Sequence, residues 1–277
     1  MRRTICLLLT LLMLAFTMTG ICTEYVQAKS ANSQTYVLVH GAWHGAWCWD
    51  QIANNLRAEG HKVIAIDLPG HGQDKAPVNE QNLETYAQAV VKVLDQQKKP
   101  VILVGHSMGG AVMSQAAEYR PEKVKKLVYV TAFLLKDGQS VDGVTGLNPK
   151  DWFKIADTGA VVLSPDRKTT TATPDFAKEA FLHDVPSAVA NKVIAQLSPE
   201  ALAAHYGILH LTSHFESIPK IFVKCGQDRA VPPDVQDKMI QATPVEKVYS
   251  IPNSSHSPFL SHPKELTDIL LDVATNL

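Results

Sequence analysis

The sequence has no excess of charge of either sign. Its 26 Lys and Arg residues are nearly balanced by 27 Asp and Glu residues, so the formal net charge is -1. A chain with this balance has no overall field with which to hold nucleic acid or an anionic membrane surface. The composition, 45% hydrophobic and 19% charged, also lacks a fibrous or disordered bias. A length of 277 residues is compatible with a single α/β domain.

Motifs for metals and nucleotides are missing as well. The glycines do not follow the dinucleotide-binding or P-loop pattern, and the histidines lack the H-E-x-x-H spacing of a zinc site. Four histidines in the middle of the chain would meet only through folding, and we expect polar lining rather than metal ligands: His183, His205, His210 and His214. The sequence therefore implies no metal and no cofactor.

The chain begins with an apolar segment that is too short and too interrupted for a membrane span. Two arginines precede an apolar stretch over residues 5–16, which is typical of a secretory signal. A span needs about 18 uninterrupted apolar residues, and threonines and a glycine dilute this stretch. We expect cleavage near Ala28, which makes residues 1–28 a signal peptide. The mature chain, residues 29–277, is then periplasmic or secreted, with no stable membrane span.

Cysteines are few, and two of the four lie in the expected signal peptide. Lipid attachment at Cys22 is disfavoured because the bulky Ile21 precedes it. Cys48 and Cys225 remain, and two cysteines in an exported chain permit a disulfide without requiring one. We expect two buried free thiols.

Short apolar runs alternate with amphipathic stretches along the mature chain. The pattern predicts strands at residues 36–39, 62–66, 101–104, 124–130, 221–224 and 247–251, and helices at 49–59, 83–97, 111–119, 235–241 and 263–277. Strands this apolar are covered on both faces, so the alternation predicts an α/β fold with a mostly parallel sheet between helices. The rhythm breaks over residues 133–217, where we expect an insertion with short helical pieces in place of strands.

The pentapeptide Gly-His-Ser-Met-Gly at 105–109 follows a predicted strand and precedes a predicted helix. This is the context that a G-x-S-x-G nucleophile elbow requires. The two glycines let the flanking backbones pass closely around a strained serine, so Ser107 is the candidate nucleophile. Because Ser107 lies at a helix N-terminus, the N–H of Met108 is a candidate donor to an oxyanion.

A serine nucleophile needs a histidine base and an acid, which follow it along the chain in the order acid, histidine. Asp228 comes after the strand at 221–224 and is the candidate acid. Asp234 is the alternative, although its expected place is the first turn of the next helix. His256 lies in a polar loop after the last strand and is the candidate base, with His262 as its rival.

The loop after the first mature strand carries His-Gly-Ala-Trp at 40–43 and is expected to supply the second oxyanion donor. Ala42 N–H is the candidate. His40 is interpreted as a residue that holds this loop by hydrogen bonds rather than as a second base.

Four segments together resemble the methylesterase and hydroxynitrile lyase group of α/β-hydrolases. They are the elbow, His-Gly-Ala-Trp-His-Gly-Ala-Trp-Cys-Trp at 40–49, Asp-Leu-Pro-Gly-His-Gly at 67–72 and Cys-Gly-Gln-Asp at 225–228. Phe-Leu-His-Asp at 181–184 and Leu-Ser-Pro-Glu at 197–200 look like parts of that group's cap. The resemblance spans nearly all of the mature chain and implies the α/β-hydrolase fold, with residues 133–217 as a small, mainly helical cap over Ser107.

The resemblance also separates two activities. The lyases of this group carry a threonine in the oxyanion loop and a lysine directly after the catalytic histidine, whereas this chain has Gly41 and Ser257 at those places. Ester hydrolysis needs only the triad and the oxyanion hole, so a serine carboxylesterase is favoured. A hydroxynitrile lyase and a small-molecule receptor with residual hydrolase activity are the alternatives.

We expect the substrate to be a small ester with an apolar or aromatic group. Aromatic residues in the cap suggest an apolar pocket, although such residues also pack a cap onto its domain. The candidates for substrate contact are Gly41, Trp152, Phe153 and Phe181. Neither the natural ester nor the oligomeric state follows from the sequence, and a homodimer stays open.

Overall fold

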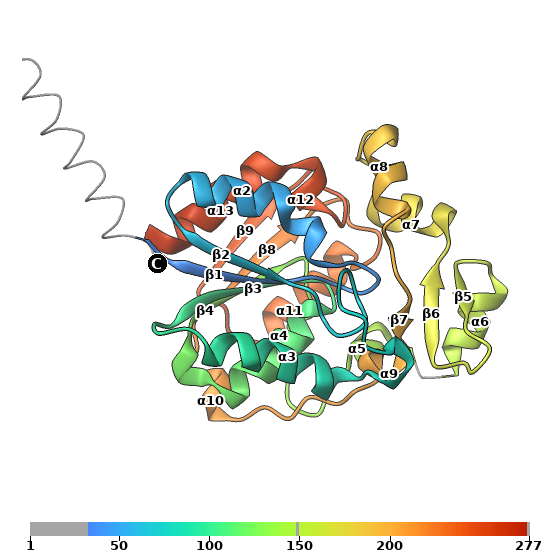
Figure 1. The fold of residues 1–277 in the computed structure, drawn as a ribbon, viewed down its shortest axis with the longest axis horizontal. Helices are drawn as coiled ribbons and strands as arrows, with labels where there is room; N and C mark the ends of the chain where they lie inside the picture. The colour runs from blue at the N-terminus through green and yellow to red at the C-terminus, as the bar shows by residue number, and fades with distance from the viewer. Residues whose placement is uncertain (1–32, 148–149, 276–277) are drawn as a thin grey trace, which may run out of the picture.

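A computed structural model describes residues 33–147 and 150–275, and the expected signal peptide lies outside them (Figure 1). The centre of the fold is a six-stranded sheet with the strand order β2-β1-β3-β4-β8-β9. The strands are β1 (Thr35–Val39), β2 (Lys62–Ile66), β3 (Val101–His106), β4 (Val124–Val130), β8 (Lys220–Cys225) and β9 (Lys247–Ile251). Each neighbouring pair is parallel. The predicted parallel sheet is confirmed.

Helices cover both faces of this sheet (Figure 1). Side chains alternate between the two faces of a strand, so Val37 and Val39 of β1 enter one hydrophobic core while Tyr36 and Leu38 enter the other. The first core is completed by α3 (Leu83–Asp95), α4 (Gly109–Tyr119) and α11 (Pro233–Ala242). The second is completed by α2 (Asp50–Ala58), α12 (Pro258–Ser261) and α13 (Pro263–Thr275).

Local sequence explains where the helices begin. At the start of α3, the Asn82 side chain accepts a hydrogen bond from Thr85 N (3.0 Å) while Asn82 N donates to Thr85 Oγ1 (2.9 Å). This reciprocal pair satisfies two backbone groups at the helix start. At α11, Pro233 occupies the first helical position, where its missing N–H costs nothing.

The chain between β4 and β8 forms the cap, and it contains strands that we did not expect. Its helices are α5 (Val141–Thr145), α6 (Asp151–Asp157), α7 (Pro174–Phe181), α8 (Ser187–Ile194), α9 (Leu202–His205) and α10 (Ser213–Glu216). A small antiparallel sheet joins β5 (Val161–Leu163), β6 (Thr169–Ala172) and β7 (Glu200–Ala201). The threonines of β6 and the valines of β5 are β-branched and favour extended backbone, which accounts for these strands.

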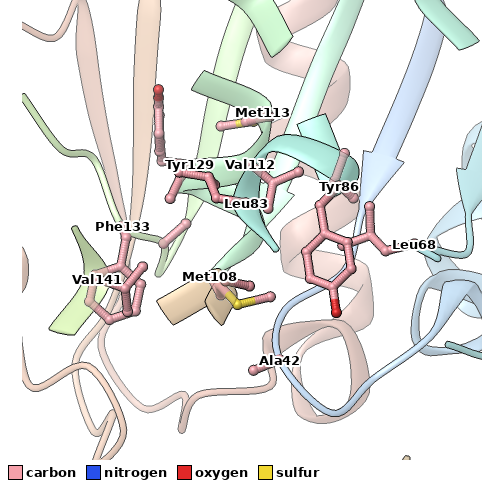
Figure 2. Close-up of a cluster of buried hydrophobic side chains, with 14 of the residues drawn as sticks. Ala42, Leu68, Leu83, Tyr86, Met108, Val112, Met113, Tyr129, Phe133 and Val141 are labelled. Atoms are coloured by element: carbon pink, nitrogen blue, oxygen red, sulfur yellow. The ribbon is translucent and has the colours of Figure 1, made fainter. Parts of the chain in front are cut away.

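Much of the cap stands beside the main sheet, where α6, α7, α8, β5 and β6 lie at one end of the molecule (Figure 1). A continuous core nevertheless joins cap and sheet. Figure 2 shows Val141 of α5 in the same buried cluster as Met108 and Ala42, the two residues expected to supply oxyanion donors.

Two further findings concern the cysteines and the membrane. Cys48 and Cys225 are both buried and unpaired, as expected. Within the described ranges, no helix combines the length and the apolar character that crossing a bilayer demands.

Candidate active site

Ser107 lies between β3 and α4 in a left-handed backbone conformation, with φ of 52°. A non-glycine residue rarely adopts this angle, so the surrounding structure must impose it. A Cβ added to Gly109 would come within 2.5 Å of His40 O, and one added to Gly105 within 2.8 Å of Gly109 O. Both glycines of the elbow are therefore required by close backbone contacts, as the motif predicts.

The predicted acid and base meet in the loops that follow β8 and β9. His256 Nδ1 lies 2.7 Å from Asp228 Oδ2, and the two side chains are 3% and 0% exposed. Because the carboxylate accepts, Nδ1 carries the proton and Nε2 is left as the proton acceptor. His256 and Ser107 line the same cavity, so the structure brings the three predicted residues into one site.

Three hydrogen bonds fix the Asp228 carboxylate in addition to its bond with His256. Ala230 N and Val231 N donate to Oδ1 at 2.7 and 2.8 Å, and the Thr131 hydroxyl donates to Oδ2. Thr131 has a positive φ of 40° directly after β4, the neighbour of β8 in the sheet. We did not predict this contact; the signal was a hydroxyl residue at the carboxyl end of the adjacent strand.

The rivals of the acid and the base lie elsewhere. Asp234 is exposed in the first turn of α11 and pairs with Lys238 Nζ at 3.0 Å, an interaction that lowers the pKa of Asp234. His262 Nδ1 lies 2.9 Å from Ser261 Oγ at the end of α12. The geometry therefore favours Asp228 and His256.

The loop after β1 places Gly41 and Ala42 against the elbow. A Cβ on Gly41 would approach Ser107 Cβ to 2.7 Å, so Gly41 leaves room for the serine and does not line the cavity. Ala42 and Met108 both line it. Neither backbone N–H donates to another residue of the described ranges, so both are free to bind an oxyanion.

His40 holds this loop, as interpreted from the sequence. Its Nδ1–H donates to Gly41 O at 2.8 Å, and its Nε2 accepts from Leu68 N at 3.1 Å. Burial, assisted by His71, lowers the pKa of His40 to about 3, so its ring is neutral at pH 7. A neutral ring with both nitrogens occupied is not available as a base.

A buried carboxylate from the cap, Glu200, supports the next residue of the same loop. Trp43 has a positive φ of 61°, and its N–H donates to Glu200 Oε2 at 3.2 Å. The same carboxylate bonds His71 Nε2 at 3.1 Å and the Tyr86 hydroxyl at 2.9 Å. Trp43 O in turn accepts from Ser198 N at 2.9 Å. The cap therefore fixes the backbone on either side of this turn.

Glu200 and His71 form a buried ion pair. Burial alone would raise the pKa of Glu200, but His71 and the hydrogen bonds outweigh it and lower this pKa to about 2. Burial likewise opposes a charged His71, yet Glu200 raises the pKa of the imidazole. Both shifts favour the charged forms of the two side chains. Removing either partner would leave the other as an uncompensated buried charge, which is destabilising.

The cap also contacts the loops that carry the acid and the base. The Asp184 carboxylate accepts from Ser255 N at 2.8 Å and from the Ser255 hydroxyl, directly before His256. His183 Nε2 donates to Gln227 O at 2.9 Å, directly before Asp228. Neither contact was expected, because residues far apart in the chain make it.

A cavity of about 320 Å³ lies over Ser107 and is largely apolar. Six of its wall residues are Trp43, Phe133, Trp152, Phe176, Phe181 and Val231. Trp152 and Phe181 thus occupy the predicted pocket. Phe153 does not line this cavity, because it follows Trp152 on α6 and a residue one step along a helix faces a different side; Arg167 lies 5.1 Å over its ring.

Glu200→Gln tests whether this carboxylate positions the oxyanion loop. An amide has one acceptor oxygen, so it leaves either Trp43 N or Ala201 N without a partner. We expect kcat for an ester to fall about tenfold with a smaller change in KM, because the oxyanion forms only after binding. The free energy of unfolding should fall by about 1–3 kcal/mol.

The matched control is Glu122→Gln, since Glu122 is exposed. Both kcat and the urea midpoint of the control should equal those of the unmodified protein. Equal kcat values for Glu200→Gln and the unmodified protein would contradict the positioning role.

Comparisons with known proteins agree with this geometry. A model of the alpha/beta hydrolase family matches residues 36–269. The chain is 34% identical to methylesterase 7 of Arabidopsis thaliana over 252 residues, or 88% of this chain and 97% of that protein. Its fold matches the crystal structure of a pyrethroid hydrolase from Sphingobium faniae JZ-2 with a TM-score of 0.77 and 26% identity, covering 88% of this chain and 98% of that one. The chain therefore belongs to the alpha/beta hydrolase family.

Proposed function

We propose that this protein is a serine carboxylesterase that cleaves small esters through an acyl-enzyme intermediate. The observation that carries the proposal is the buried His256–Asp228 hydrogen bond, made by a histidine that lines the same cavity as Ser107. A histidine held in this tautomer by a carboxylate is the base that an unactivated serine requires.

In the proposed reaction, Ser107 Oγ attacks the ester carbonyl while His256 Nε2 takes its proton. The carbonyl oxygen becomes an oxyanion that accepts from the N–H groups of Ala42 and Met108. His256 then protonates the leaving alcohol, and water repeats the sequence on the acyl-enzyme. Asp228 stays ionised and stabilises the imidazolium that forms in each half.

The cavity supports small, apolar substrates. Its volume of about 320 Å³ is at the lower end of the range for ligand pockets, and aromatic and aliphatic side chains dominate its walls. The names of two similar proteins, methylesterase and pyrethroid hydrolase, denote an esterase and a hydrolase. A small ester with an apolar or aromatic group is consistent with both observations.

The polar groups of the cavity favour hydrolysis over cyanide release. The residue after His256 is Ser257, no lysine lines the cavity within the described residues, and the Arg229 side chain that lines it is paired with Glu179. A departing cyanide would lack an ammonium to stabilise it, whereas an ester oxyanion has two free N–H donors.

The esterase proposal predicts serine-dependent turnover of p-nitrophenyl esters by residues 29–277. In a series from acetate to palmitate, we expect kcat/KM to peak at short or aromatic acyl groups because the cavity is small. Ser107→Ala should lose at least about 10³-fold in kcat, while Ser187→Ala, at an exposed serine of α8, should match the unmodified protein. Turnover by Ser107→Ala near the unmodified rate would refute the mechanism, and binding without turnover would favour a receptor.

We also propose that the protein is exported and that residues 1–28 are removed. The charged start and short apolar centre of this segment support the proposal. When a bacterial host expresses the full chain, mass spectrometry should find an N-terminus near Lys29 in the periplasm or the medium. Leu12→Arg, which interrupts the apolar centre, should leave the full-length chain in the cytoplasm. An uncleaved cytoplasmic product from the unmodified gene would contradict export.

A further inference from the structure

Two neighbouring ionisable side chains lie in the wall of the largely apolar cavity, which Thr145, Arg229 and His256 also line. Asp142 lies in α5 and His205 at the end of α9, and both line the cavity that contains Ser107. They are 2% and 5% exposed. His205 Nδ1 lies 3.7 Å from Asp142 Oδ1, which is close enough for electrostatic attraction and too long for a hydrogen bond.

Each member of this pair has a polar atom that the described part of the chain does not satisfy. Asp142 Oδ2 accepts from Trp152 Nε1 at 2.8 Å, but Asp142 Oδ1 has no hydrogen-bond partner. His205 Nε2 is also buried without a partner. Leaving a buried polar atom without a hydrogen bond costs about 1–3 kcal/mol of stability. Two such atoms in the wall of one cavity therefore require an explanation.

Surrounding aromatic residues restrict how this pair could find partners within the protein. The His205 ring contacts two indoles, with ring centres 4.9 Å from Trp152 and 5.8 Å from Trp43, which lie 6.4 Å from each other. These contacts and the burial of His205 restrict the rotation of its imidazole. A ligand in the cavity is then the natural source of the missing hydrogen bonds.

The chemistry of the pair selects the kind of group it would bind. Asp142 beside Nδ1 favours a proton on that nitrogen, so Nε2 accepts in a neutral ring and donates in a charged one. A hydroxyl both donates and accepts, and it suits either state of His205. A substrate carboxylate would meet the negative charge of Asp142, and an alkyl group would leave both atoms unpaired.

We propose that Asp142 and His205 form a polar subsite that binds a hydroxyl group on the substrate, so that the preferred substrates are hydroxy esters. This inference rests on the proposed esterase function and narrows its substrate class. The ester group occupies the site at Ser107, and the hydroxyl lies elsewhere on the acyl or alcohol part. The subsite gives an apolar pocket the small number of polar contacts that fix a ligand's orientation.

Matched esters test the subsite. The probes are methyl 3-phenylpropanoate and its meta-hydroxy, para-hydroxy and para-methoxy derivatives, hydrolysed by residues 29–277. We expect kcat/KM for one hydroxy ester to exceed that for the unsubstituted ester about tenfold, the factor for one well-placed hydrogen bond. The methoxy ester, which cannot donate and is bulkier, should show no such preference.

Two variants assign the preference to the pair. His205→Phe keeps an aromatic ring and should reduce the ratio of hydroxy to unsubstituted ester to about one. Asp142→Asn, which retains an acceptor for Trp152, should reduce it in part. Thr145→Val is the matched control, because Thr145 lines the same cavity and its hydroxyl already donates to the backbone oxygen of Asp142 at 2.9 Å; its ratio should equal that of the unmodified protein.

Binding separates this inference from the esterase proposal. The same esters are titrated calorimetrically into Ser107→Ala, where a hydroxyl preference in Kd is expected even without turnover. If no ester is hydrolysed but the preference appears in Kd and disappears with His205→Phe, the subsite stands and the esterase proposal fails. A ratio near one for every hydroxy ester in the unmodified protein, or a ratio that His205→Phe leaves unchanged, overturns the subsite.

Discussion

Ser107 has a left-handed backbone conformation at the junction of β3 and α4. The close backbone packing at this turn restricts several neighbouring positions to glycine. Gly105, Gly109 and Gly41 each have another atom within 2.8 Å of where a side chain would begin. The turn also leads directly into α4, whose N-cap is Met108, so the Met108 N–H lies at a helix start where negative charge is favoured. The backbone of the turn therefore fixes the position of Ser107, and the other residues of the site are arranged around that serine.

The cap does more than cover Ser107, because its side chains also hold the loops of the site in place. It sends Glu200 to the turn at Trp43, next to one proposed oxyanion donor, and Asp184 to the residue before His256. A displacement of the cap would therefore disturb the oxyanion loop and the base together. Because both contacts are made by carboxylates with low solvent exposure, losing a partner costs more than losing a surface hydrogen bond. The closed arrangement of cap and sheet and the reactive geometry thus depend on each other.

Sequence predicted the parts of this protein that local physics determines. The six core strands were placed within one residue at their starts, because each is a short apolar run that helices must cover. Ser107, Asp228 and His256 were proposed as a triad because the elbow has a local signature and the others follow strands in a fixed order. The structure brings these three residues together, and their catalytic roles stay a proposal.

The contacts that depend on folding were not predictable in this way. Thr131, Asp184 and Glu200 approach their partners from residues 97, 71 and 157 positions away in the chain, with no local pattern to mark them. The strands of the cap were missed because β5 and β6 pair only with each other and with the two residues of β7. Phe153 was placed in the pocket on its aromatic character, but α6 turns only one of two adjacent aromatic residues into the cavity.

The most direct test of the account is the site of covalent modification by a fluorophosphonate ester, a reagent that activated serines attack. Intact mass and peptide mapping of residues 29–277 after reaction should show one phosphonyl group, on Ser107, with loss of ester hydrolysis in proportion to labelling. Hydrolysis that continues in fully labelled protein, or a label on another residue, would contradict the proposal that Ser107 is the nucleophile.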